Sequence, residues 1–89
     1  MARSDLSLIM DAEIAARCGA ADQLFNLGML YAIGRDVQQD FVAAHKWFNL
    51  AAMRGNVEAK ARRAEVALEM TATQIADAQR EARAWLMAN

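Results

Sequence analysis

Histidine is the residue type best suited to acid–base chemistry, and this chain contains only one, His45. A general base or a metal ligand needs partners, and the nearest polar candidates in the chain are Asp40, Lys46 and Asn49. Helical phase places His45 beside Ala44 on the outer edge of its helix. We therefore predict an ordinary surface histidine rather than a catalytic or metal-binding one.

The sequence also contains a single thiol, Cys18. One cysteine excludes an intramolecular disulfide framework and a cysteine-based zinc site within one chain. Cys18 precedes Gly19 at a predicted helix end, where the negative end of the helix dipole disfavours the thiolate. We therefore predict that Cys18 has a packing role in a reducing compartment.

Two pairs of carboxylates occur at helical spacing, Asp11 with Glu13 and Glu65 with Glu69. Acid–base catalysis by such a pair requires a cleft that gives the two groups different environments. On exposed helices both pairs are expected to be solvated. Because the chain also lacks a nucleophile–base pair and a phosphate loop, we predict no catalytic, cofactor-binding or metal-binding residue and no enzyme activity.

The one local basic cluster contains Arg54, Lys60, Arg62 and Arg63. We expect a solvated face, paired at helical spacing with Glu58, Glu65 and Glu69. The alternative is an acidic partner segment. A nucleic-acid-binding domain is disfavoured by the net charge of −1, although residues 73–76, with Arg80 and Arg83 after them, faintly resemble a helix-turn-helix.

The composition predicts one small helical domain spanning residues 1–89. Hydrophobic residues make up 56% of the chain, proline is absent, and residues with high helix propensity dominate. The apolar patch at residues 6–10 is too short for a secretory signal, and no run approaches the roughly 18 residues of a membrane span. We expect a soluble, cytoplasmic protein without membrane contact.

Apolar periodicity and helix-end residues divide the chain into helices. Asp40 is a predicted N-cap, and Thr71 with Gln74 fits a capping box. The aromatic residues Phe25, Tyr31, Trp47 and Phe48 are expected to pack in the core or at its edge. The pattern predicts five helices, over residues 4–18, 20–33, 40–53, 57–69 and from 71 onward.

A glycine in the middle of the second predicted helix needs a reason, because Gly28 costs about 1 kcal/mol of helix propensity relative to alanine. We predict that a neighbouring helix approaches closely there, with the indole of Trp47 opposite. The connection over residues 35–39 is predicted to turn its one apolar residue, Val37, inward.

The sequence matches itself at an offset of 36 residues. Ala15, Ala16 and Gly19 then coincide with Ala51, Ala52 and Gly55. A period of this length is typical of helical solenoids, in which each helix pair packs on the next.

One complete unit of this repeat resembles the Sel1-like repeat, a relative of the tetratricopeptide repeat (TPR). The matching positions are Leu27, Gly28, Tyr31, Gly34, Val37, Asp40, Ala44, Trp47, Ala51, Ala52 and Gly55. Residues 20–54 would form this full repeat, and residues 56–88 a degenerate repeat with a C-terminal cap. Ala64 replaces the helix glycine there, and its ending is similar to the tail of many bacterial Sel1-like proteins. Residues 4–18 would form an N-terminal capping helix.

The resemblance implies an all-α fold, an α/α solenoid of about five antiparallel helices. It also implies a non-catalytic adaptor that binds a protein or peptide partner through its concave face, with no cofactor. Helical phase predicts that this face carries Asn26, Leu30, Ile33, Arg62, Arg63 and Val66. The alternative is a structural protein that forms a homo-oligomer and buries the open ends of the solenoid.

Overall fold

The computed structural model describes residues 20–88 and contains four helices and no strand within that range. The all-helical prediction is therefore confirmed. The predicted helix over residues 4–18, with Cys18 and the Asp11–Glu13 pair, lies outside the described residues. The helices are α2 (Ala21–Ile33), α3 (Phe41–Met53), α4 (Val57–Ala67) and α5 (Ala72–Ala88).

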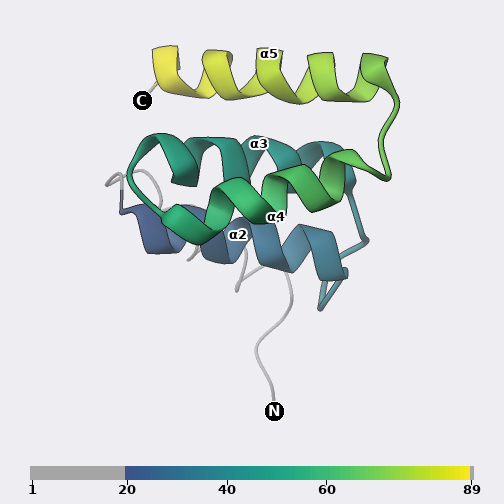
Figure 1. Cartoon of the computed structure of the whole chain (residues 1–89), viewed down its shortest axis with the longest axis horizontal. Coiled ribbons are helices and arrows are strands. Elements are labelled where there is room, and N and C mark those ends of the chain that lie inside the picture. Colours follow the sequence, from purple (N-terminus) through teal and green to yellow (C-terminus); the bar gives the residue numbers. More distant parts are fainter. Residues whose placement is uncertain (1–19, 89) are drawn as a thin grey trace.

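Helix α3 is the element on which the described helices are assembled (Figure 1). Successive helices run in opposite directions, and α2 and α5 lie on different sides of α3. Helices α2, α4 and α5 each pack on α3, whereas no other pair of described helices packs extensively. The described helices therefore have the predicted antiparallel order. Helix α3 is the most buried of the four, with six buried residues.

Phe48 and Gly28 create the closest approach between α2 and α3. A Cβ atom added to Gly28 would lie 2.5 Å from Phe48 Cε1, which is too close for a real contact. The predicted close approach is confirmed, but the aromatic residue opposite is Phe48 and not Trp47. Trp47 lies about 100° further round α3, where its ring packs edge-on against Trp85 of α5 at a centroid distance of 5.7 Å.

The core consists mainly of medium-sized and small apolar residues from all four helices. The predicted packing role of the aromatic residues is confirmed, because Trp47 and Phe48 are buried and Phe25 and Tyr31 are half-buried against the core. Val37 also packs against the core, as predicted. The buried apolar members are Leu24, Leu27, Ala44, Trp47, Phe48, Leu50, Ala51, Ala59, Val66, Ala78 and Ala82.

Side chains cap the starts of three helices. Asp40 Oδ1 accepts the Ala43 N–H at 3.1 Å, and Asn56 Oδ1 accepts the Ala59 N–H at 2.9 Å. Thr71 and Gln74 form a reciprocal capping box, with distances of 2.9 and 3.1 Å. The predicted Asp40 and Thr71 caps are therefore confirmed, and Asn56 is a further one.

Candidate functional site

The α2 residues of the predicted partner surface lie on one side of that helix. Asn26, Leu30 and Ile33 are four and three residues apart, so their side chains project in similar directions. Asn26 is exposed and the side chain of Ile33 is 59% exposed, while Leu30 is half-buried against the core. These three residues form what we call the α2 stripe.

Arg62 of the predicted surface is held between two glutamates on α4. Its guanidinium lies 3.1 Å from Glu58 Oε2 and 3.2 Å from Glu65 Oε1. Hydrogen bonds to these carboxylates raise the pKa of Arg62 above its usual value. Of the predicted pairing of the basic cluster, the contacts of Arg62 with Glu58 and Glu65 are thus confirmed. The three side chains together carry one net negative charge.

Arg63 and Val66 face α3 instead of a surface shared with α2. Arg63 Nη1 donates a hydrogen bond to Asn49 Oδ1, and Val66 is only 7% exposed. Val66 was expected on an open face, and this placement corrects that expectation: α4 turns its Ala59 and Val66 side onto α3.

The six predicted residues therefore do not form one surface. Helices α2 and α4 do not pack extensively. A hydrogen bond near the starts of both helices joins them, from Asn56 Nδ2 to Asp22 Oδ1 at 3.2 Å. The α2 stripe and the ion-paired Arg62 remain as the accessible part of the prediction.

His45 is buried, which makes the prediction of a surface histidine wrong. Its exposed fraction is 4%, and its Nδ1 atom has no hydrogen-bond partner. Burial lowers the pKa of His45, and the nearby charge of Arg63 lowers it further. The error arose because α4 covers the side of α3 that carries His45 and Asn49, a contact that local periodicity does not reveal.

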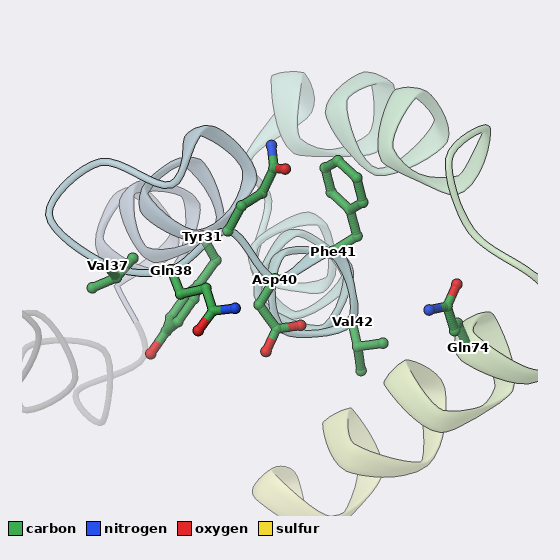
Figure 2. Close-up of a pocket in the computed structure, with 8 residues that line it drawn as sticks. Tyr31, Val37, Gln38, Asp40, Phe41, Val42 and Gln74 are labelled. Carbon is green, nitrogen blue, oxygen red and sulfur yellow. The ribbon is translucent and has the colours of Figure 1, made fainter.

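The structure contains an open hollow of about 850 Å³ where α2 ends, α3 begins and α5 begins (Figure 2). Asp40 is its only charged lining residue. The other lining side chains are aromatic, aliphatic or amide groups. The full lining consists of Tyr31, Val37, Gln38, Gln39, Asp40, Phe41, Val42 and Gln74.

Hydrogen bonds fix the loop that forms one wall of the hollow against the end of α2. Gly34 ends α2 in the left-handed conformation with φ 76°, and Gln39 Nε2 donates to the Ala32 carbonyl at 2.8 Å. The Asp40 N–H donates to the Tyr31 carbonyl at 3.0 Å. These hydrogen bonds hold residues 39 and 40 against α2 and thereby fix this wall of the hollow.

Sequence reasoning did not identify this hollow. Its lining is assembled from the 31–42 region and from Gln74, more than thirty positions further along. The Asp40 cap and the inward position of Val37 were predicted separately. No motif in the sequence joins them to Gln74, since their proximity depends on how α5 packs on α3.

The described residues include no group of three or more His, Cys, Asp or Glu side chains that could hold a metal ion. Within residues 20–88 no helix is long and apolar enough to cross a membrane. Comparison with known proteins finds no matching family model, no matching curated protein and no matching solved structure.

Proposed function

We propose that this protein is a non-catalytic interaction module, an adaptor that binds a protein or peptide partner through the α2 stripe. The observation that carries the proposal is the position of Ile33, a large apolar side chain that is 59% exposed on the same side of α2 as Leu30 and Asn26. Protein interfaces combine an apolar centre with a polar rim, and Ile33 and Leu30 beside Asn26 would supply both kinds of contact.

The repeat pattern supports the same proposal. The antiparallel order of α2 to α5 and the close Gly28–Phe48 contact are compatible with one full Sel1-like repeat followed by a degenerate one. We propose on this basis an α/α solenoid of the TPR-like kind, and a bacterial, cytoplasmic adaptor. The Arg62 and Arg63 contacts described above make an acidic partner a weaker alternative than an apolar one.

The test compares two exposed apolar positions in one co-purification experiment from the native host. Ile33→Arg changes the α2 stripe, while Leu68→Arg changes a side chain that is 85% exposed beyond the end of α4. Neither residue is in the core, so both variants should fold, which circular dichroism will verify. We expect a partner that is retained by wild type and Leu68→Arg and lost with Ile33→Arg. Equal retention by both variants would reject the α2 stripe.

Self-association is the second candidate function, favoured by the exposed apolar side chains of Met53, Val57 and Met87. A homo-oligomer would bury some of this surface. Sedimentation velocity should then detect a species larger than a monomer at micromolar concentration. A stable monomer at several hundred micromolar would eliminate this candidate.

A further inference from the structure

We propose that the hollow between α2, α3 and α5 binds a basic side chain, that of lysine or arginine, from an extended peptide segment. This site is separate from the α2 stripe, and the proposal goes beyond the function proposed above. The two proposals can therefore fail independently.

The charge of the hollow selects a cation. Asp40 is the only charged residue among the lining side chains, and Figure 2 shows its carboxylate directed into the space between Gln38 and Val42. Asp40 Oδ1 accepts the Ala43 N–H. A carboxylate has about four acceptor positions, so the cap leaves capacity for a ligand ammonium or guanidinium group.

The remaining lining suits the other parts of a basic residue in an extended chain. Val42, whose side chain lies on the same side as the Asp40 carboxylate (Figure 2), offers apolar surface to the aliphatic stem, and Lys and Arg side chains commonly lie along such surface. Gln74 lies across the hollow from Val42 with its amide nitrogen turned toward that side chain (Figure 2). Because Gln74 Oε1 accepts the Thr71 N–H, the amide nitrogen is left as a donor for a peptide carbonyl.

The hollow is organised before any ligand arrives. The loop before α3 is tied to α2 by the hydrogen bonds from Gln39 and from the Asp40 N–H, and Gln74 is held by its capping box. A fixed lining avoids part of the ordering cost of binding. One exposed ion pair is worth only about 0–1 kcal/mol, so we expect a preference of several-fold for a basic residue and not an all-or-none effect.

The experiment titrates the full-length protein with four pools of acetylated, amidated pentapeptides that differ only in the central residue: lysine, arginine, norleucine or glutamate. Backbone amide shifts in NMR spectra report the binding site and the dissociation constant. We expect the lysine and arginine pools to shift residues 37–42 and 74, and to bind at least threefold more tightly than the norleucine and glutamate pools.

Two matched variants test the role of the carboxylate. Asp40→Asn removes the charge and keeps an N-cap residue. Asp36→Asn removes an equal charge from the same loop at a residue that does not line the hollow; its φ of 65° is a conformation that asparagine tolerates. The basic preference should disappear in Asp40→Asn and persist in Asp36→Asn.

Three results would overturn the proposal. They are equal binding of the norleucine and lysine pools, an unchanged preference in Asp40→Asn, and shifts confined to residues outside the hollow. Should Asp40→Asn fail to fold, the wild type decides the question: a preference for basic residues that persists undiminished in 0.5 M salt would also reject an exposed ion pair with Asp40.

Discussion

Helix α3 meets α2 and α4 through interfaces of different chemistry. Toward α2 the contact is apolar and depends on shape, because the ring of Phe48 fills the space that a side chain at Gly28 would occupy. The ring centroids of Phe25 and Phe48 are 5.5 Å apart. Toward α4 the contact is mixed: α3 meets the buried Ala59 and Val66, and it also presents two polar side chains, His45 and Asn49.

The difference shows that one helix can be held by two kinds of specificity. The α2 contact tolerates little change in side-chain volume, because an added carbon atom would clash in a close-packed interface. The α4 contact contains a buried imidazole nitrogen without a hydrogen bond, which is a group that costs free energy on folding. The first interface should therefore respond to volume and the second to pH.

The largest expected effect is that of Phe48→Ala, which leaves a cavity in the interface between α2 and α3. Removing a buried phenylalanine side chain typically lowers the free energy of unfolding by about 3–5 kcal/mol. Val66→Ala, which shortens a buried residue on the α4 side, should lower it by only about 1–2 kcal/mol. Urea unfolding followed by circular dichroism measures both values. Equal losses would contradict the view that the α2 interface contributes more to stability.

A smaller effect is expected from Gly28→Ala, which adds one carbon to the same interface. The gain in helix propensity, about 1 kcal/mol, should be outweighed by steric conflict with the buried Phe48 ring, for a net loss of about 1–3 kcal/mol. Ala64, the position that the 36-residue offset in the sequence pairs with Gly28, is exposed.

Ala64→Gly provides the matched control, with a loss of at most about 1 kcal/mol from propensity alone. Combining Gly28→Ala with Phe48→Leu should recover at least about 0.5 kcal/mol relative to the sum of the single effects. Strictly additive losses would show that the Gly28–Phe48 contact is not the cause.

The smallest effect concerns His45 and appears as a pH dependence. Burial holds its pKa below the ordinary value of 6.5 in the folded chain, so the unfolded chain takes up the proton first as the pH falls. His45 titration therefore leaves the free energy of unfolding unchanged well above pH 6.5, and this free energy decreases as the pH falls below 6.5 toward the lower, folded-state pKa. The slope cannot exceed about 1.4 kcal/mol per pH unit for one group.

His45→Leu supplies the reference for this measurement, because leucine fills a similar volume without the unpartnered nitrogen. Urea denaturation of both proteins between pH 7.5 and 5.5 should give curves that diverge as the pH falls, with the wild type losing stability faster. Parallel curves would show that the imidazole does not titrate differently in the folded and unfolded chains.

The apolar interface could be predicted from the sequence to a useful extent. A glycine inside a helix pattern has few explanations, so Gly28 predicted a close approach correctly, although the facing ring proved to be Phe48. Capping residues act within one turn of the chain, which is why the Asp40 and Thr71 caps were predicted at their observed positions.

The polar interface and the hollow could not be predicted in the same way. The burial of His45 depends on which side of α3 is covered by α4, and the hollow depends on where α5 places Gln74. Both are consequences of packing between segments distant in the sequence. For the same reason the predicted partner surface was divided, with Val66 in the core and Asn26 and Ile33 exposed on α2.

Because α2, α4 and α5 each pack on α3, the described helices can unfold locally in different ways. Helices α4 and α5 share α3 but few contacts with each other, so neither must leave before the other can. Amide hydrogens of α4 and α5 should accordingly exchange through separate local openings, whereas those of α3 should exchange only when the whole domain unfolds.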